Sequence, residues 1–243
     1  MPSSSPQTLP LVVAILAGGL GKRLRPLVSD LPKSLASVGG EPFLFLLLRK
    51  LSFYGIKKVI LLTGYMHEKV QAACGDGSAF ELELHYSFEQ QPLGTAGALA
   101  NAAAYLAQES EFILLNGDTY LDAPLSGFLD CKLGSKPYGR LAVMKTNDSS
   151  RFGSVLVNTQ GEIEAFREKD TQSTGLINAG IYKLSNKIFK RIPTGVFSSL
   201  ECDIFPKLIE EQGSLEAYQL EGSLHDIGTP ESYQAFNVDR MES

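Results

Sequence analysis

The sequence contains few cysteines and histidines, and neither type forms a recognisable cluster. The three cysteines and three histidines are scattered along the chain: Cys74, Cys131 and Cys202, and His67, His85 and His225. There is no Cys-x-x-Cys pair and no spacing typical of a zinc site. A convincing Ser/His/Asp or Cys/His catalytic set is also lacking. We therefore predict reduced cysteines in the core and chemistry that needs no protein nucleophile.

Positive charge is also scarce. Lysine and arginine number 22 against 27 aspartates and glutamates, which leaves a formal net charge of −5, and the basic residues form no stripe. This balance argues against nucleic acid as a partner. If the ligands are anionic, a few focused cations at one site must bind them against the overall charge.

No long hydrophobic run is present. The apolar stretch 11–17 ends at Gly18, is too short to span a membrane and lacks the charged flank of a signal peptide. We therefore expect a cytoplasmic protein without membrane association. There is no Pro/Ser-rich linker and no internal repeat, and 243 residues with 44% hydrophobic content suit one domain. The prediction is a flexible tail over residues 1–10 and a single domain over 11–243.

The first half of the sequence predicts parallel strands connected by helices. Strands are predicted at 11–17, 57–63, 82–88 and 112–116, and helices at 42–54 and 95–107. The apolar runs have the composition of strands that are covered on both faces. Alternation of strand and helix implies crossover connections.

After Asp118 the pattern becomes mixed or antiparallel. Strands are predicted at 141–146, 153–158, 162–167 and 176–183, and helices at 186–191, 201–212 and 230–238. The predicted fold class is α/β. It has a Rossmann-like, mostly parallel central sheet flanked by helices, with a smaller mixed or antiparallel extension.

A glycine-rich loop follows the first predicted strand. In Leu16-Ala-Gly-Gly-Leu-Gly-Lys-Arg-Leu-Arg-Pro26, three glycines let backbone amides approach a ligand and form an anion-binding concavity. A dinucleotide motif would need glycine where Leu24 stands, and a Walker A loop would need Ser or Thr where Arg23 stands. The loop therefore predicts a phosphate site of another kind. A strand-to-helix turn with two solvated cations is the alternative.

Two cations near this loop are candidates for binding phosphate. Arg23 supplies a planar fork for the β- and γ-phosphates of a nucleotide. Lys33 follows the turn Asp30-Leu-Pro32 and can supply a second positive charge. Together they could neutralise a leaving pyrophosphate.

These residues resemble the signature of the sugar-1-phosphate nucleotidylyltransferase family, except that Lys22 stands where the family more often has Thr or Ser. Further matching segments follow in order over nearly the whole chain: Pro92-Leu-Gly-Thr-Ala-Gly-Ala-Leu99, Asn116-Gly-Asp118, Phe166-Arg-Glu-Lys169, Asn178-Ala-Gly-Ile-Tyr182 and Asp226-Ile-Gly-Thr-Pro230. The resemblance implies an enzyme that joins a nucleoside monophosphate from an NTP to a sugar 1-phosphate and releases pyrophosphate. Residues 11–120 would mainly bind the nucleotide, and residues 121–243 the sugar phosphate.

The resemblance assigns Asp118 and Asp226 to Mg2+, which takes hard oxygen ligands and usually only one or two carboxylates. Either aspartate alone could be a turn residue or a helix cap. The implied reaction is an in-line displacement at the α-phosphorus. Mg2+, Arg23 and Lys33 would stabilise the charge that moves to pyrophosphate, and Asp118 would join these two cations as a catalytic residue by binding the metal.

The resemblance also implies a set of nucleotide contacts: Leu16, Ala17, Gly18, Gly19, Gly21, Lys22, Arg23, Glu89, Pro92, Gly94, Thr95, Asn116 and Gly117. Glu89 and Gly94 are expected at the base. Guanine offers adjacent N1–H and N2–H donors that one carboxylate can accept together, whereas uracil and thymine offer one ring N–H. Glu89 therefore favours GTP, although a solvated glutamate at a strand end fits the sequence equally well.

The sugar phosphate is assigned, by the same resemblance, to Gly153, Glu168, Lys169 and Asn178. Glu168 can accept two sugar hydroxyls, and Lys169 can meet the phosphate as a point charge. Asn178 would hydrogen-bond the sugar, and Gly153 would allow its close approach. A surface Glu-Lys pair is the alternative for residues 168 and 169.

Segments 149–155 and 198–206 are most similar to D-glycero-D-manno-heptose 1-phosphate guanylyltransferases, whose product GDP-heptose would serve surface polysaccharide or glycan synthesis. Mannose-1-phosphate guanylyltransferases are similar almost as closely. Uridylyl or thymidylyl transfer to another sugar phosphate stays open, as does a homodimer. A non-catalytic sugar-nucleotide sensor would be expected to lack Arg23, Lys33 or one of the two aspartates, and all four residues are present.

Overall fold

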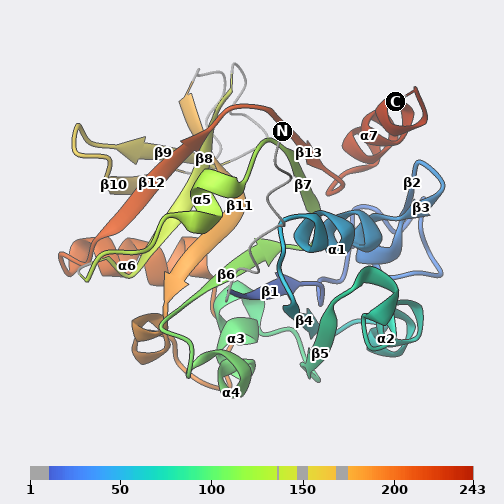
Figure 1. Cartoon of the computed structure of the whole chain (residues 1–243), viewed down its shortest axis with the longest axis horizontal. Coiled ribbons are helices and arrows are strands. Elements are labelled where there is room, and N and C mark those ends of the chain that lie inside the picture. The colour runs from blue at the N-terminus through green and yellow to red at the C-terminus, as the bar shows by residue number, and fades with distance from the viewer. Residues whose placement is uncertain (1–10, 136, 147–152, 168–174, 243) are drawn as a thin grey trace, which may run out of the picture. The chain divides into compact units, whose positions relative to one another are not determined.

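The computed structural model describes residues 11–135, 137–146, 153–167 and 175–242 (Figure 1). These residues form two compact units whose segments alternate along the sequence. Unit 1 contains residues 11–92, 115–120 and 225–242, and unit 2 contains 93–114 and 121–224. The predicted halves, 11–120 and 121–243, are by contrast each continuous.

Three parallel strands lie side by side in unit 1, in the order β1, β4, β5. β1 (Val12–Leu16) pairs with β4 (Lys58–Thr63), and β4 pairs with β5 (Glu83–Phe88). The middle residues of β1 and β4 are completely buried, as expected for parallel strands that are covered on both faces.

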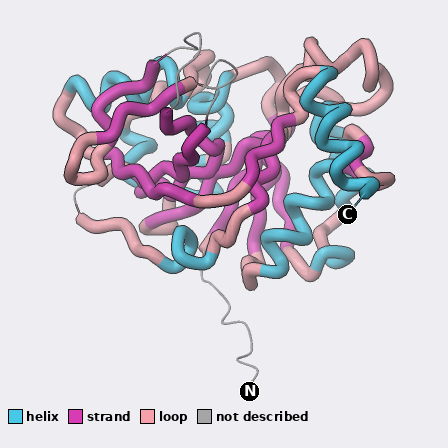
Figure 2. Tube along the Cα trace, turned by 90° about the horizontal axis from the view of Figure 1, so that it is seen from above, coloured by secondary structure: helices cyan, strands magenta, loops and turns pink. Residues whose placement is uncertain are grey.

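Two helices of unit 1 pack against each other through apolar side chains. α1 (Phe43–Phe53) buries six of its residues: Phe43, Leu44, Leu46, Leu47, Leu48 and Leu51. α7 (Pro230–Glu242) places Phe236 edge-on to Phe43, with ring centroids 6.2 Å apart, and Figure 2 shows that the chain ends on this helix. The remaining elements are α2 (His67–Cys74), η1 (Lys33–Leu35), η2 (Ser78–Phe80), β2 (Ser37–Val38) and β3 (Glu41–Pro42).

The strands of unit 2 form a mixed sheet. β10 (Ile163–Arg167), β9 (Ser154–Val157), β11 (Gly175–Ser185) and β8 (Gly139–Thr146) pair antiparallel in that order. β12 (Leu215–Leu220) pairs parallel with β8. Three further strands contain residues of both units. β6 (Glu111–Asn116) runs beside β11, and β7 (Thr119–Asp122) pairs with β13 (Ser223–Asp226) in a separate ribbon.

The helices of unit 2 are short. They are α3 (Gly94–Asn101), α4 (Ala103–Leu106), α5 (Ser126–Asp130), the 3₁₀ helix η3 (Asn186–Lys190), the π-helix η4 (Leu200–Ile204) and α6 (Phe205–Glu210). With the parallel sheet of unit 1 and the mixed sheet of unit 2, the predicted α/β fold with an antiparallel extension is confirmed.

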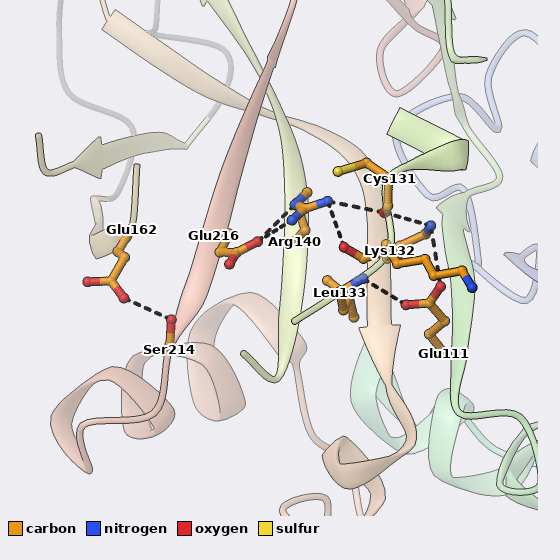
Figure 3. Close-up of polar contacts among 9 residues, drawn as sticks. Glu111, Cys131, Lys132, Leu133, Arg140, Glu162, Ser214 and Glu216 are labelled. Carbon is orange, nitrogen blue, oxygen red and sulfur yellow. Dashed lines mark hydrogen bonds and ion pairs between the residues drawn. The ribbon is translucent and has the colours of Figure 1, made fainter. Parts of the chain in front are cut away.

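Polar contacts link Arg140 of β8 to β12 and to the segment 131–133 (Figure 3). Arg140 donates from Nε and Nη2 to one Glu216 oxygen of β12, at 2.9 and 2.5 Å, and from Nη1 to the Cys131 carbonyl oxygen at 3.1 Å. The Leu133 N–H donates to Glu111 at 2.9 Å. The segment 131–133 is therefore held to both β6 and β8.

A lysine is buried in the same region. The side chain of Lys183, on β11, is 1% exposed, and its ammonium donates to the carbonyl oxygens of Leu129 and Cys131 at 2.7 and 2.9 Å. Burial lowers the pKa of Lys183, and Glu111, at 3.7 Å, opposes that shift. Three partners thus satisfy a charge that would be costly to bury alone.

Several predicted elements differ from those observed. The predicted helix 95–107 is divided at Ala102, and the predicted helix 201–212 begins as a π-helix. α2 was not predicted because only Val70 and Cys74 on it are buried, which leaves little periodic signal. Cys74 is buried as predicted, but Cys131 and Cys202 are exposed. No helix in the described part of the chain has the length and apolar character needed to cross a membrane.

Candidate active site

Two other segments of unit 1 are hydrogen-bonded to the chain at the end of β1. Ala17 N–H donates to the Leu62 carbonyl oxygen at 2.8 Å, and Gly117 N–H donates to the Leu16 carbonyl oxygen at 3.0 Å. A Cβ atom on Gly117 would lie 2.3 Å from that Leu16 oxygen. Only glycine therefore allows the predicted segment 116–118 to lie against the start of the glycine-rich loop.

The loop itself makes a tight turn at Gly21, whose φ is +56°. The N–H groups of Leu24 and Arg25 donate to the Gly21 carbonyl oxygen at 2.9 and 3.1 Å. Leu24 is completely buried, whereas Lys22 and Arg23 are exposed. The buried leucine anchors the turn and leaves both cations on its solvent side, where an anionic ligand can reach them.

Lys33 connects this loop to Asp118. Its Nζ donates to Asp118 Oδ2 at 2.6 Å, and the two side chains are 12% and 42% exposed. A Cβ atom on Gly21 would lie 3.0 Å from the Lys33 Cβ, so the lysine stem packs directly against the loop. The structure thus brings together three elements that were predicted separately: the loop, its second cation and the first metal ligand.

The two predicted metal ligands are neighbours in unit 1. Ile227, next to Asp226, donates its N–H to the Asp118 carbonyl oxygen at 3.0 Å. Asp226 Oδ1 accepts the Gly228 N–H at 2.6 Å, and Asp118 Oδ1 accepts the Thr119 hydroxyl at 3.2 Å. Among the described residues, no three His, Cys, Asp or Glu side chains form a metal-binding group. Two carboxylates on fixed backbone fit Mg2+, which takes its other ligands from phosphate and water.

An aromatic stack supports Asp226. The His225 ring stacks on Phe236 of α7 with centroids 4.4 Å apart, and Tyr120 stacks on Phe236 at 5.6 Å. His225, which precedes Asp226, and Tyr120, two residues after Asp118, therefore pack on the same Phe236 ring. The His225 ring thus packs on α7, next to Asp226.

Glu89 lies against two glycines at the ends of neighbouring strands. A Cβ atom on Gly18 would lie 2.9 Å from Glu89 Oε1, and one on Gly64 would lie 3.0 Å from the same oxygen. The Glu89 N–H donates to the Thr63 carbonyl oxygen at 2.9 Å. The carboxylate is thus placed beside the glycine-rich loop rather than projecting freely into solvent.

The other predicted nucleotide contacts of unit 1 have varied surroundings. Gly19 and Pro92 are exposed, and a Cβ atom on Gly19 would meet nothing within 4 Å. Asn116 has a buried amide oxygen with no hydrogen-bond partner among the described residues. A water or a ligand hydroxyl is the kind of donor that satisfies such an atom.

Within unit 2, Asn178 lies at an irregularity of β11. The pairing of β11 with β8 shifts between Asn178 and Tyr182, and Gly180 there has a φ of +70°. Asn178 Oδ1 accepts the Gly180 N–H at 3.0 Å, and its Nδ2 donates to the Tyr182 hydroxyl at 2.9 Å. Bulges of this kind re-aim side chains and occur next to active sites.

Gly94 and Thr95 begin α3, where they pack on the segment before η4. A Cβ atom on Gly94 would lie 2.4 Å from the Ser198 carbonyl oxygen, which already accepts the N–H groups of Ala96 and Gly97 at 2.9 and 3.2 Å. Glycine was expected here so that the backbone could approach a base. Close packing on Ser198 is a second physical reason for it.

Of the remaining predicted sugar-site residues, only Gly153 lies in the described part of the chain. Gly153 is exposed, and a Cβ atom on it would make an ordinary 3.4 Å contact with the Arg167 carbonyl oxygen. Glu168 and Lys169 lie outside the described residues. Their roles stay predictions.

Two polar residues near Asn178 were not predicted from the sequence. Tyr182 is completely buried, yet its hydroxyl donates to Glu201 Oε1 at 2.8 Å. Glu201 belongs to a segment, 198–206, that was used only to judge similarity. The sequence offered only a serine followed two residues later by a glutamate at the start of a predicted helix. Ordinary helix caps have the same pattern, so it does not indicate a functional residue.

Comparison with known proteins places the whole described chain in one group. A family model described as "Nucleotidyl transferase" matches residues 12–243. The chain is 36% identical to the mannose-1-phosphate guanylyltransferase of Mycobacterium tuberculosis, over 93% of this chain and 63% of that protein. It is 35% identical to the D-glycero-alpha-D-manno-heptose 1-phosphate guanylyltransferase of Campylobacter jejuni, over 93% and 98% of the two chains.

A solved structure agrees with the sequence matches. HddC from Yersinia pseudotuberculosis, crystallised with GMP-PN, superimposes with a TM-score of 0.83 at 33% identity and covers 94% of this chain and 99% of its own. The chain therefore spans less than two thirds of the Mycobacterium protein but nearly all of the Campylobacter and Yersinia proteins.

Proposed function

Because the chain belongs to the nucleotidyl transferase family, we propose that it transfers GMP from GTP to D-glycero-alpha-D-manno-heptose 1-phosphate. The products are GDP-heptose and pyrophosphate. The relatives from Campylobacter and Yersinia, matched over nearly their whole length, support this choice of substrates. Mannose 1-phosphate is the second candidate because the Mycobacterium relative is equally similar in sequence.

The observation that carries the chemistry is the cluster of the glycine-rich loop, Lys33, Asp118 and Asp226 in unit 1. In the proposed reaction an oxygen of the sugar phosphate forms a bond to the α-phosphorus of GTP. The bond from that phosphorus to the β-phosphate oxygen breaks, and pyrophosphate leaves. No protein nucleophile takes part, so the residues act by positioning and by neutralising charge.

Each residue of the cluster has a distinct proposed role. The loop amides and Arg23 bind the β- and γ-phosphates, and Lys33 neutralises charge at the same end. Asp118 and Asp226 would hold Mg2+, which when bound neutralises the triphosphate and polarises its oxygens. The Lys33 ammonium keeps the Asp118 carboxylate oriented through Oδ2.

Selection of the base is proposed for Glu89. Its carboxylate, fixed beside Gly18 and Gly64, is suited to accept the N1–H and N2–H donors of guanine. On the sugar side, Asn178, Gly153, Glu168 and Lys169 are proposed to bind the sugar phosphate. We place the enzyme in the cytoplasm and propose a homodimer as the alternative to a monomer.

The test is a substrate panel. Pyrophosphate release is measured with GTP, ATP, CTP and UTP against heptose 1-phosphate, mannose 1-phosphate and glucose 1-phosphate. GTP with the heptose phosphate should give the highest kcat/KM. UTP should be about ten- to a hundredfold poorer, because it leaves a hydrogen bond to a charged group unmade.

Different outcomes overturn different parts of this proposal. A preference for UTP would reject the guanine assignment but leave nucleotidyl transfer intact. Equal use of mannose 1-phosphate would reject only the heptose assignment, since one extra carbon is often worth about 1–3 kcal/mol in a pocket. Absence of transfer with every pair would reject the enzymatic function.

A further inference from the structure

Glu201 stands at the start of the π-helix η4 and collects three hydroxyl groups. Its Oε1 accepts the Tyr182 hydroxyl at 2.8 Å, and its Oε2 accepts the hydroxyls of Thr95 at 2.8 Å and Ser199 at 2.9 Å. These partners come from three separate elements of unit 2: β11, α3 and the residue before η4. One carboxylate therefore connects segments that are far apart in the sequence.

The direction of these hydrogen bonds is fixed by other donors. The Tyr182 oxygen accepts Asn178 Nδ2 at 2.9 Å, the Thr95 oxygen accepts the Leu200 N–H at 2.8 Å, and the Ser199 oxygen accepts the Cys202 N–H at 3.2 Å. Each hydroxyl then directs its hydrogen to Glu201. An ionised carboxylate accepts and does not donate, so it matches all three hydrogens at once.

The Tyr182 branch determines how Asn178 is oriented. The Asn178 amide donates from Nδ2 to Tyr182 and accepts the Gly180 N–H at Oδ1. Rotating the amide by half a turn would place its oxygen against the Tyr182 oxygen and its NH2 against the Gly180 N–H. The carboxylate of Glu201 thus sets, through Tyr182, which end of the Asn178 amide faces which neighbour.

The Thr95 branch reaches the other predicted substrate segment. Thr95 is the second residue of α3, and the Ser198 N–H donates to the Leu93 carbonyl oxygen at 2.8 Å, just before that helix. A single side chain is therefore hydrogen-bonded to one residue predicted to bind nucleotide and, through Tyr182, to one predicted to bind sugar.

From this geometry we propose that Glu201 is a positioning residue for sugar binding, which acts through Tyr182 on the Asn178 amide. The proposal rests on the proposed function, because it takes Asn178 as a sugar contact. Glu201 itself does not touch the substrate. Its carboxylate fixes the direction in which the hydroxyl groups donate. The Tyr182 oxygen must then accept from Asn178, which allows only one orientation of the Asn178 amide.

Replacing the carboxylate by an amide of the same shape tests the proposal. Glu201→Gln puts an NH2 group opposite a hydroxyl hydrogen, so the network must reverse somewhere. Tyr182→Phe removes the link to Asn178 but leaves the Thr95 and Ser199 bonds to Glu201 in place. Asp203→Asn is the matched control: Asp203 lies on the same π-helix, is exposed and accepts the Ser199 N–H at 2.7 Å.

Steady-state kinetics with both substrates varied give the first measurement. Glu201→Gln and Tyr182→Phe should each raise KM for the sugar phosphate by about ten- to a hundredfold, the size expected when a positioning group is displaced. KM for GTP should change less than KM for the sugar phosphate in Tyr182→Phe. The double variant should be no worse than the poorer single variant, because both changes break one chain.

The side-chain amide signal of Asn178 gives a second measurement that needs no activity. In a protein with ¹⁵N-labelled asparagine, the Asn178 NH2 resonances, assigned from Asn178→Asp, should move in Glu201→Gln and in Tyr182→Phe but not in Asp203→Asn. If wild-type protein transfers to no sugar phosphate, the proposed function fails, and this spectrum still tests the network.

Two results would overturn the positioning role. One is an unchanged sugar-phosphate KM, or an unmoved Asn178 amide signal, in Glu201→Gln. The other is a loss of activity that Asp203→Asn shares equally and that follows a lowered melting temperature, since Glu201 would then only hold η4 together.

Discussion

Lys33 Nζ lies 2.6 Å from Asp118 Oδ2, although 85 residues separate the two along the chain. The sequence predicted both residues, but for different tasks: Lys33 for pyrophosphate and Asp118 for the metal. Their ion pair places the lysine proposed to neutralise pyrophosphate directly against the carboxylate proposed to bind the metal. The pair is partly exposed, so its effect on catalysis is expected to exceed its effect on stability.

Removing either carboxylate charge at the metal site should stop turnover. Asp118→Asn and Asp226→Asn keep the side-chain shape but lose a hard anionic ligand, and we expect each to reduce pyrophosphate release more than about a hundredfold at saturating Mg2+. Asp122→Asn, at the exposed end of β7, is the control and should be near normal. Near-normal rates in both site variants would refute the metal assignment.

Lys33 and Asp118 should behave as a unit. Lys33→Met should lower kcat by about a hundred- to a thousandfold, as is typical when a group that stabilises transition-state charge is removed. The double variant with Asp118→Asn should lose far less than the product of the two single losses. Strictly multiplicative losses, measured as kcat for all four proteins, would mean that the two residues act independently.

Two glycines near the active site should respond differently to alanine. Gly117→Ala places a Cβ 2.3 Å from the Leu16 carbonyl oxygen, and we expect a destabilisation of about 1–3 kcal/mol by urea denaturation. Gly19→Ala meets no atom within 4 Å and should leave stability within about 0.5 kcal/mol. If the nucleotide approaches Gly19 as proposed, KM for GTP rises in that stable variant, whereas an unchanged KM argues against close approach.

Glu89→Gln should weaken selection of the base without disturbing the fold. Glutamine has the same shape and keeps the packing on Gly18 and Gly64, but it cannot accept two guanine donors as a carboxylate does. We expect kcat/KM for GTP to fall about ten- to a hundredfold while that for UTP stays nearly constant. A parallel fall for both nucleotides would place Glu89 in the structure rather than at the base.

Alkaline pH should destabilise the protein through two acids, Cys74 and Tyr86, whose pKa values are raised in the folded state. Burial raises the pKa of Cys74 from 9.0 to about 12 and that of Tyr86 from 10.0 to about 12. Between these values the unfolded chain has lost protons that the folded chain keeps, so stability falls as pH rises from about 9 toward 12. Cys74→Ala should be less stable at neutral pH but show a shallower fall.

The exposure of the three thiols provides a check on this assignment. Cys131 and Cys202 are exposed, whereas Cys74 is buried. A thiol reagent should therefore label Cys131 and Cys202 quickly and Cys74 only when the chain unfolds. Fast labelling of Cys74 in the native protein, or an unchanged pH profile in Cys74→Ala, would show that the thiol is accessible.

The strands and helix of unit 1 could be predicted because their residues are buried with a clear period. β1, α1, β4 and β5 were each predicted to within one or two residues of their bounds. The break at Ala102 could not be predicted, because the run around it is rich in alanine and favours helix throughout. At the start of η4, the hydroxyls of Ser199 and Thr95 both donate to Glu201, and such a contact with distant Thr95 is not visible in a local pattern.

Prediction of the candidate site depended on motifs rather than on distances. The resemblance supplied the glycine-rich loop, Lys33, Asp118 and Asp226 as separate positions, and only the structure shows Lys33 against both Gly21 and Asp118. Glu201 was missed because its partners on β11 and α3 are 19 and 106 residues away, and only Ser199 is close in the sequence. A hydrogen-bond network among distant residues leaves no periodic signal in the sequence.

The alternation of the two units along the chain has a consequence for exchanging parts between relatives. The chain leaves one unit for the other after residues 92, 114, 120 and 224. A chimera that takes unit 2 from another family member therefore needs two inserted segments, 93–114 and 121–224. The six residues left in place between these inserts, 115–120, include Asp118. A single crossover point cannot exchange unit 2 alone: a crossover after residue 120 keeps Asp118 but leaves 93–114 unexchanged and replaces the segment that contains Asp226.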